Sequence, residues 1–133
     1  MGPIRGQIVV VEQVGLQQWW MDDVTETYAI PRSETIVLGG TAEQGNWSRV
    51  PDPAAAQAIV ARCAAIVPEH ARALERARVV AHRVGLRPGR PTVRLEEERI
   101  GGSRVVHWYG HGGSGVTLSW GCADGVAGLV GPA

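Results

Sequence analysis

Strand-forming runs lie on both sides of one alanine-rich helical segment, and this order restricts the folds open to the chain. Two β-branched runs precede the segment, GQIVVVE at residues 6–12 and TIVL at residues 35–38. Strand character returns after it in short runs at residues 79–80, 84–86, 92–95 and 104–108. Strands that are grouped before and after helices, rather than alternating with them, predict an α+β fold with a mostly antiparallel sheet and helices on one face.

The run at residues 6–12 is predicted to be a central strand. Its apolar residues do not alternate with polar ones, which is typical of a strand that is buried on both faces. Strand character resumes at residues 28–30 and stops at Pro31, with an irregular stretch in between. We therefore expect a hairpin with an irregular tip, followed by a third strand that ends at Gly39 and Gly40.

The helical segment carries its own start and stop signals. Asp52 can accept hydrogen bonds from the first amides of a helix, and Pro53 at the first helical position loses no hydrogen bond. An apolar stripe follows at spacings of three and four: Ala56, Ile59, Val60, Cys63 and Ile66. The sequence predicts a helix from Pro53 to about Val67, where Pro68 stops it, and a second short helix over residues 68–76.

Composition narrows the range of functions. The 133 residues suffice for one domain, and 13 basic residues against 13 acidic ones leave a formal net charge of zero. Nucleic acid is therefore not expected as a partner, because no long-range field would attract it. The two cysteines have no metal-type spacing, and no apolar run approaches the roughly 20 residues that span a bilayer. We expect a cytoplasmic protein without a membrane partner.

The most distinctive local pattern is GHGGSG at residues 110–115. It lies between a strand that ends near Tyr109 and an apolar run, residues 116–130, that is predicted to be a helix. Glycines allow a ligand to approach the backbone closely, and the free amides at a helix start favour electron-rich oxygen. A tight, flexible turn would explain the same glycines. The pattern alone leaves both interpretations open.

An arginine and a tyrosine are candidates for binding a small molecule. Arg87 precedes Pro88, which pushes its backbone toward an extended conformation. A guanidinium suits bidentate capture of a carboxylate, but Arg90 and Arg94 compete for the role, and an ordinary surface arginine is the simpler interpretation. Tyr28 at a strand end could offer its hydroxyl to a ligand or be a core tyrosine.

The sequence shows no side chains arranged to catalyse a reaction by themselves. His107 and His111 lie four residues apart, without a third metal ligand at suitable spacing, so no metal site is expected. Ser114 and Ser119 lack the nucleophile elbow of hydrolases. Any chemistry would therefore have to come from a cofactor.

These segments together resemble the C-terminal part of the D-amino-acid oxidase family. The resemblance runs from IRGQIVVVE through TIVLGGTAEQGNWS and VGLRPGRPTVRLE to VVHWYGHGGSGVTLSWGCA, which is nearly the whole chain. Trp108 departs from the family, which usually has Asn, His or Ala at this position. The last stretch is the most specific, and these residues fit the family's signature: Val105, Val106, His107, Tyr109, Gly110, Gly112, Gly113, Gly115, Gly121 and Ala123.

The resemblance implies roles for individual residues. Arg87 resembles the arginine that binds the substrate carboxylate, and Tyr28 resembles the tyrosine whose hydroxyl assists it. Gly113 resembles the residue whose carbonyl accepts a hydrogen bond from the substrate amine. The flavin of FAD would lie along Gly112, Gly113, Ser114, Gly115, Val116 and Thr117. The implied reaction is oxidative deamination of D-amino acids to 2-oxo acids, with release of ammonia and hydrogen peroxide.

Related flavoenzymes and a non-catalytic role are the alternatives. Ala42 follows LGGT where the similar D-aspartate oxidases carry an arginine, which favours neutral D-amino acids. A fragment of a D-aspartate-oxidase-like or glycine-oxidase-like enzyme would share the flavin. A non-catalytic module would keep the fold and bind a carboxylate or a partner chain.

The resemblance also implies a division of the chain and a missing portion. Residues 1–109 would form the substrate-binding domain, and residues 110–133 the turn and helix that contribute to the flavin site. The family's Rossmann-like FAD-binding half, with its GxGxxG turn, has no counterpart in this sequence. We therefore expect a truncated chain that is inactive by itself and has this N-terminal half as its partner. The last helix would pack on that half and, left bare, could support homo-oligomers.

Overall fold

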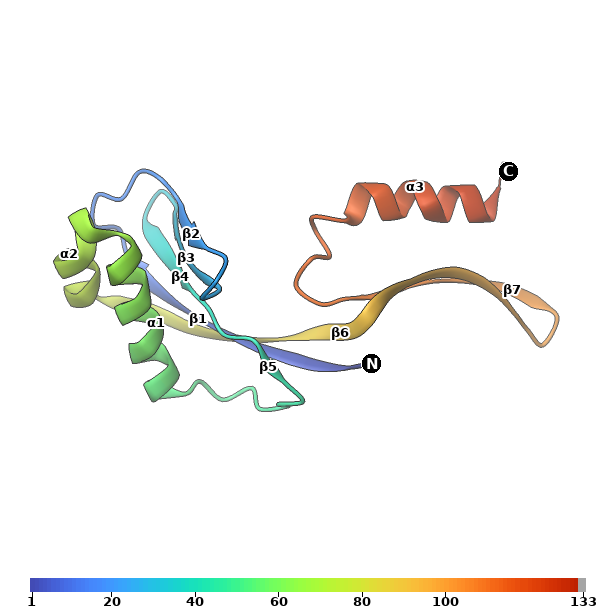
Figure 1. Cartoon of the computed structure of the whole chain (residues 1–133), viewed down its shortest axis with the longest axis horizontal. Coiled ribbons are helices and arrows are strands. Elements are labelled where there is room, and N and C mark those ends of the chain that lie inside the picture. The colour runs from blue at the N-terminus through green and yellow to red at the C-terminus, as the bar shows by residue number, and fades with distance from the viewer. Residues whose placement is uncertain (132–133) are drawn as a thin grey trace. The chain divides into compact units, whose positions relative to one another are not determined.

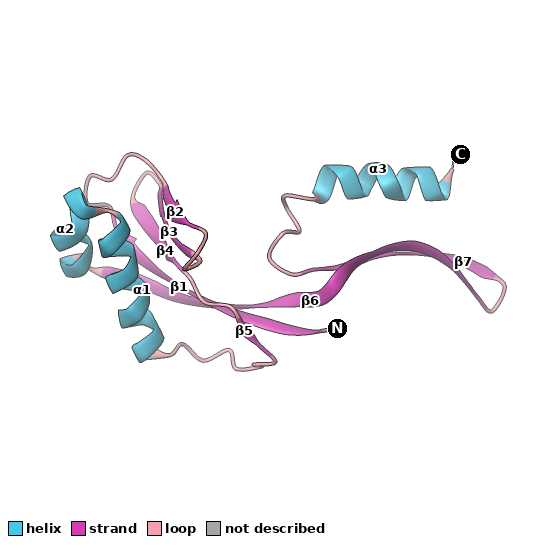
Figure 2. Cartoon of the chain, in the orientation of Figure 1, coloured by secondary structure: helices cyan, strands magenta, loops and turns pink. Residues whose placement is uncertain are grey.

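The computed structural model describes residues 1–131, so the last two residues of the predicted C-terminal segment lie outside the described residues. Within them, seven strands, three α-helices and one 3-10 helix follow along the chain (Figure 1). Figure 2 colours them by type. In order they are β1 (Gly2–Glu12), β2 (Trp20–Asp22), β3 (Thr27–Pro31), β4 (Thr35–Gly39), β5 (Glu43–Gln44), α1 (Pro53–Ile66), η1 (Pro68–His70), α2 (Ala71–Arg76), β6 (Val79–Ile100), β7 (Ser103–His111) and α3 (Ser119–Val130).

The strands follow the order β2-β3-β4-β1-β6-β7, and β5 also pairs with β1. The pairs β1–β4, β2–β3, β3–β4 and β6–β7 are all antiparallel. The predicted α+β fold with a mostly antiparallel sheet is therefore confirmed, as is the central position of β1. The predicted hairpin between residues 6–12 and residues 28–30 is wrong, because β1 pairs with β4 and β3 lies between β2 and β4. Part of the expected irregular tip is itself a strand, β2, in which Met21 lies opposite Tyr28.

The chain divides into two compact units. Residues Arg5–Leu86 form one, called here the core unit. Met1–Ile4 and the described residues from Arg87 onward form the other, called here the hairpin unit because it contains the β6–β7 hairpin. Both β1 and β6 contribute residues to each unit.

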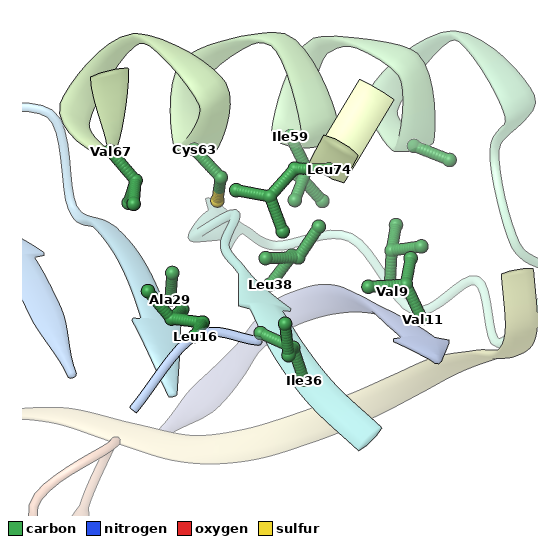
Figure 3. Packing of buried hydrophobic residues seen from close by; sticks show 11 residues of the cluster. Val9, Val11, Leu16, Ala29, Ile36, Leu38, Ile59, Cys63, Val67 and Leu74 are labelled. Carbon is green, nitrogen blue, oxygen red and sulfur yellow. The ribbon is translucent and has the colours of Figure 1, made fainter. Parts of the chain in front are cut away.

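In the core unit, α1 packs on the sheet through the predicted apolar stripe (Figure 3). Asp52 caps the helix as expected, because its Oδ1 accepts a hydrogen bond from the Ala54 amide at 2.9 Å. The second predicted helix forms as η1 followed by α2, which contributes Leu74 to the core. The buried cluster contains Val9, Val11, Leu16, Ala29, Ile36, Leu38, Ala56, Ile59, Cys63, Val67 and Leu74.

Strand β1 is less buried than its sequence predicts. Gln7, Val9 and Val11 are fully buried, whereas the residues between them, Ile8 and Val10, are half-buried. Successive side chains of a strand point to opposite faces, so the face with Val9 and Val11 meets the helices. The opposite face is covered only in part by the described residues.

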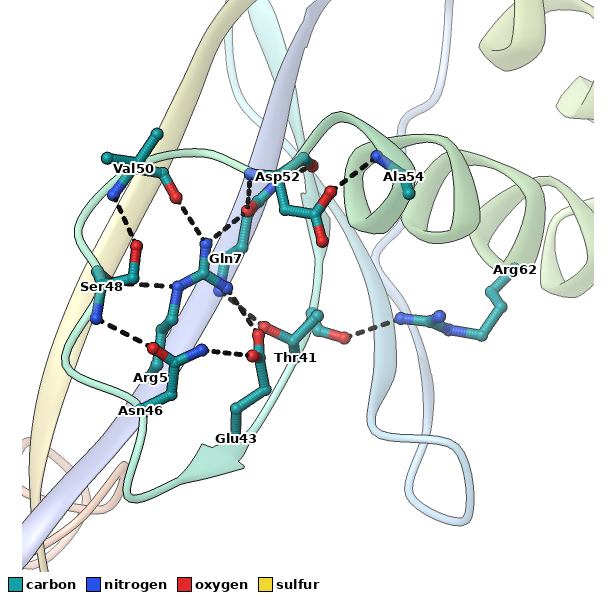
Figure 4. A network of polar contacts seen from close by, with 11 residues as sticks. Arg5, Gln7, Thr41, Glu43, Asn46, Ser48, Val50, Asp52, Ala54 and Arg62 are labelled. Carbon is teal, nitrogen blue, oxygen red and sulfur yellow. Dashed lines mark hydrogen bonds and ion pairs between the residues drawn. The ribbon is translucent and has the colours of Figure 1, made fainter.

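A buried arginine on β1 holds the loop that leads into α1 (Figure 4). Arg5 is only 2% exposed and forms an ion pair with Glu43. Its guanidinium also donates to the carbonyl of Ser48 at 3.1 Å and to that of Val50 at 2.8 Å. A further hydrogen bond reaches Oε1 of Gln7 at 2.9 Å. A charge that is taken out of water needs such partners, and here the loop supplies most of them.

Gln7 extends this network to the start of α1 (Figure 4). Its Oε1 accepts a hydrogen bond from the Asp52 amide, and its Nε2 donates to the Asp52 carbonyl, both at 2.8 Å. One buried side chain therefore bonds both the amide and the carbonyl of the residue that caps the helix. The sequence pattern does not indicate this role for Arg5 or Gln7, because there they are only polar residues near the start of an apolar strand.

In the hairpin unit, the short strands predicted after residue 84 merge into longer ones. β6 continues through Pro88 and Pro91, and its register to β7 shifts between Gly89 and Arg94. Proline fixes a φ that extended backbone accepts, and the residue before it is pushed the same way. Pro91 lies within this shift and therefore interrupts the ladder to β7 without ending the strand, and Pro88 directly precedes the first paired residue, Gly89.

Helix α3 begins at Ser119, so the prediction of a helix from residue 116 is wrong at its start. Residues 115–118 form turns, and no side chain caps the helix at Leu118. The helix rests on the hairpin at Gly125, where a Cβ would lie only 2.7 Å from Cδ2 of Leu95. No helix within residues 1–131 is long and apolar enough to cross a membrane.

We predict that Arg5→Ala lowers the free energy of unfolding by about 3 kcal/mol, because buried acceptors lose their charged partner. The matched control is Arg78→Ala, whose side chain is 72% exposed in its ion pair with Glu12, and should cost less than about 1 kcal/mol. Urea unfolding followed by circular dichroism measures both. Equal losses in the two variants would contradict the role assigned to Arg5.

Burial raises the pKa of the Cys63 thiol to about 11. The thiol lies 3.3 Å from the Tyr28 carbonyl oxygen, to which it donates, and is fully buried. In a Cys122→Ser background, Cys63 should resist alkylation at about pH 8 and react within minutes once urea unfolds the chain, because only the thiolate reacts. Because the folded state favours the neutral thiol, stability from this group is lost as pH rises through the folded pKa. Rapid alkylation of the folded chain at about pH 8 would contradict this burial.

Candidate functional site

The glycine run after β7 forms a turn that is tied to β6. Gly110 and Gly112 have φ angles of +89° and +55°, in the left-handed region that favours glycine. The Gly112 amide donates a hydrogen bond to the Pro88 carbonyl at 2.9 Å, and the Ser114 amide donates to the His111 carbonyl at 3.0 Å. The turn is therefore fixed to the stretch of β6 that carries Arg87.

Two other glycines of the turn are not explained by the conformation of the chain. Gly113 and Gly115 lie outside the left-handed region. A Cβ at Gly113 would lie 3.5 Å from Cδ of Arg87, and one at Gly115 would lie 3.8 Å from Cβ of His111, both ordinary contacts. The hairpin unit itself would accept alanine at either position. Neither the backbone conformation nor a close contact within the hairpin unit therefore requires glycine at these two positions.

Arg87 and Gly113, two of the three predicted substrate-binding residues, lie side by side in the hairpin unit. Arg87 is half-buried. If Gly113 carried a Cβ, this atom would lie 3.5 Å from Cδ and 3.7 Å from Nε of Arg87. Gly113 itself is exposed. The geometry therefore places a guanidinium stem beside an accessible glycine backbone, which is an arrangement that can bind a carboxylate next to a second polar group.

The other two arginines are held by Tyr109 and by glutamates. The guanidinium of Arg90 stacks on the ring of Tyr109, 5.2 Å from its centre. Arg94 donates to the Tyr109 hydroxyl at 2.9 Å and forms ion pairs with Glu96 and Glu98, each at 2.6 Å. The hydrogen bonds to Tyr109 and Glu96 raise the pKa of Arg94 above its ordinary value. Of the three arginines, Arg87 lies beside Gly113 and Arg90 lies beside Gly110.

The charged side chains around Tyr109 balance one another. The guanidinium of Arg94 and then the ring of His107 hold the pKa of Glu98 below its usual range. His107 reaches Glu98 at 2.9 Å and packs edge-on against Tyr109, with ring centres 5.9 Å apart. The positive charges of Arg90 and Arg94 therefore meet an aromatic face and carboxylates within the hairpin unit.

Tyr28 belongs to the core unit, so the structure does not bring it together with Arg87 and Gly113 within one unit. It lies opposite Gly39 in the β3–β4 pair. Its ring covers this glycine so closely that no Cβ could be accommodated there. Because its neighbour Ala29 is buried against the helices, Tyr28 points to the opposite face of the sheet.

The predicted cofactor-binding residues form a partly accessible row along the turn. Gly113, Ser114, Val116 and Thr117 are exposed, with Val116 at 90%, whereas Gly112 and Gly115 are half-buried. The Leu118 amide donates to the Ser114 carbonyl at 3.0 Å, and the Ser119 amide donates to the Val116 carbonyl at 3.2 Å. These bonds give the row a defined shape before α3 begins.

Sequence reasoning missed a polar cluster that joins the turn to α3. The Trp108 indole donates a hydrogen bond to Nε2 of His111 at 2.7 Å, and Sγ of Cys122 lies 3.5 Å from the same nitrogen. The sequence pattern presents His111 as a residue of the glycine run and Trp108 as a departure from a family signature, and indicates no contact between them. The spacing of three residues between them across a strand end is the signal that could have revealed the contact.

Comparison with known proteins supports the resemblance seen in the sequence. The D-amino-acid oxidase of Rubrobacter xylanophilus is 58% identical over 98% of this chain and 40% of that protein. The D-amino-acid oxidase of Streptomyces coelicolor is 52% identical over 96% of this chain and 40% of that protein. The chain therefore spans about 40% of the length of these curated relatives.

A solved structure with the same fold is the glycine oxidase of Geobacillus kaustophilus. It matches 96% of this chain and 34% of its own chain, with a TM-score of 0.75 and 28% sequence identity. The model of the family described as FAD dependent oxidoreductase matches residues 1–129. Because this match covers nearly all of the sequence, the chain belongs to the family of FAD-dependent oxidoreductases.

Proposed function

We propose that this chain is the substrate-binding part of an FAD-dependent D-amino-acid oxidase. Such an enzyme converts neutral D-amino acids into 2-oxo acids, ammonia and hydrogen peroxide. The observation that carries the proposal is the position of the Arg87 side chain beside Gly113, in a turn with two glycines that the chain's own contacts do not require. The identities of 58% and 52% to two D-amino-acid oxidases support the same reaction.

In this proposal three residues bind and orient the substrate. The guanidinium of Arg87 binds the substrate carboxylate, and its planar donors fix the carboxylate in one orientation. The hydroxyl of Tyr28 donates to the same carboxylate. The carbonyl of Gly113 accepts a hydrogen bond from the substrate amine, which fixes the direction of the Cα–H bond.

The turn fits the flavin of FAD. Gly113 and Gly115 leave the backbone open to a flat ring, and Gly112, Ser114, Val116 and Thr117 complete the row. Amides near the start of α3 would stabilise negative charge on the edge of that ring. When bound, FAD supplies the acceptor for the hydride that leaves the substrate Cα and the route by which oxygen is reduced to hydrogen peroxide. The protein contributes orientation and electrostatics.

Neutral substrates are preferred in this proposal. Ala42 follows the sequence LGGT and is exposed, whereas an arginine at this position would attract a second carboxylate. D-Aspartate should therefore be a poorer substrate than D-alanine.

The proposed partner is the FAD-binding portion of the oxidase. The turn and α3 present apolar side chains that the described residues leave uncovered, among them Val116 at 90%, Trp120 at 84% and Val130 at 55% exposure. Such a surface favours a partner, either the FAD-binding portion or, in its absence, a second copy of this chain. We propose a cytoplasmic location, which the two free cysteines support, and no nucleic acid as a partner, because the net charge is zero.

We predict that this chain alone produces no hydrogen peroxide from D-alanine. Peroxide should appear when FAD is added together with the part of the Rubrobacter xylanophilus protein that this chain does not match. Arg87→Ala in this mixture should lower kcat/KM at least about tenfold, because a charged hydrogen-bond pair to the substrate is worth roughly 1.5–3 kcal/mol. A coupled peroxidase assay with D-alanine and D-aspartate measures these effects.

Arg99→Ala is the matched control. Arg99 is exposed near the tip of the β6–β7 hairpin, and its loss should leave kcat/KM unchanged. Circular dichroism checks that both variants remain folded. If Arg87→Ala and Arg99→Ala are equally active in the mixture, the assignment of Arg87 to the substrate carboxylate is wrong.

A further inference from the structure

The first part of β6 is an open sheet edge in the core unit. β6 pairs with β1 on one side, and its pairing with β7 on the other side begins only at Gly89. Within the described residues, no strand therefore lies on the second side of residues 79–86. Open edges present unpaired amides and carbonyls, and proteins usually protect them by charges, prolines or a covering element.

Hydrogen bonds near Arg78 show which backbone groups face this edge. The Glu12 amide of β1 donates to the Arg78 carbonyl at 3.0 Å, and the Arg78 amide donates to Oε1 of Glu12 at 3.2 Å. Both polar groups of Arg78 thus point toward β1. Because these directions alternate along an antiparallel strand, residues 80, 82 and 84 also face β1. The backbone groups of residues 79, 81, 83 and 85 face the open edge.

An apolar cavity lies beside the same edge. It has a volume of about 440 Å³ and is lined by Val9 of β1, Ala56 and Val60 of α1, and Val79 of β6. Val79 and its neighbour Val80 are 44% and 47% exposed. β-Branched side chains are therefore left partly bare on both faces of the strand at this end of the open edge, before His82 and Arg83.

We propose that residues 79–86 of β6 bind one additional β-strand, supplied by the FAD-binding portion of the oxidase. An extended segment there completes the hydrogen-bond ladder, and one of its apolar side chains enters the cavity next to Val60. This inference rests on the proposed function, which requires such a portion. It adds a second contact between the two portions, separate from the glycine turn.

Charge favours a foreign strand over a second copy of this one. His82 and Arg83 lie in the middle of the edge, and Arg76 and Arg78 precede it. Pairing of this strand with itself would bring the cationic residues of both copies onto one short ladder, which is unfavourable for like charges that face each other. The added strand is therefore expected to carry an acidic residue opposite Arg83.

Residue-resolved amide exchange tests the proposal. In the chain alone, the amides of residues 79, 81, 83 and 85 should exchange fast, whereas those of residues 80, 82 and 84 should be protected. On addition of FAD and the unmatched part of the Rubrobacter xylanophilus protein, the first set should slow at least about tenfold. NMR of the labelled chain reads each amide separately.

Two variants sharpen the test. Ala81→Pro removes one amide that faces the edge, and should abolish the gain in protection at residues 79 and 83 while the chain itself remains folded. Arg83→Glu leaves the backbone intact and should weaken association of the two portions at least about fivefold. Arg72→Glu on α2 is the matched control, because Arg72 is exposed and lies outside the edge, and should have no effect.

The outcomes separate this proposal from the proposed function. Peroxide production without protection of residues 79, 81, 83 and 85 would overturn the added strand and leave the oxidase assignment intact. Protection without peroxide production would support the strand and count against the oxidase. If these amides are already protected in the chain alone and light scattering finds a dimer, a second copy occupies the edge and the proposal is wrong.

Discussion

The fold depends on the pairing of β1, the strand that has β4 on one side and β6 on the other. One face of β1 supplies Val9 and Val11 to the core under α1. Nearer the N-terminal end of the same strand, Arg5 and Gln7 form hydrogen bonds with the loop and the capping residue that precede α1. A single strand thus carries both the apolar packing and the polar contacts that position the helix. Without β1, strands β4 and β6 would have no common neighbour in the sheet.

The glycine turn, which is the proposed flavin site, contains two kinds of glycine. Gly110 and Gly112 are explained by their left-handed backbone, and Gly113 and Gly115 are not. The distinction matters because it divides the glycines that shape the turn from those that keep one surface clear. A bound ring on that surface would meet backbone atoms and the stem of Arg87, which fits a protein that orients a cofactor and a substrate and leaves the redox chemistry to the cofactor.

Two surfaces of the described chain remain apolar and uncovered. One is formed by Val116, Trp120 and Val130 at and after the turn, and the other by Val79 and Val80 at the open edge of β6. A chain that spans about 40% of its relatives is expected to have such surfaces, because a larger protein buries them within itself. In the proposed enzyme, both become contacts with the FAD-binding portion.

The sequence by itself determined the α+β class, the limits of α1, the position of the glycine turn and the candidates Arg87, Gly113 and Tyr28. The first three follow from caps, strand propensities and motifs, which act over a few neighbouring residues, whereas the three candidates follow from the resemblance to a known family. Only the tertiary structure decided that β6 continues through its prolines, that α3 starts at Ser119, that Arg5 is buried, and that Arg87 lies beside Gly113 whereas Arg90 lies beside Gly110. The reason is physical: strand pairing, ion pairs and burial join residues far apart in the chain, as between Arg5 and Val50, and no local pattern encodes which distant partner a side chain will meet.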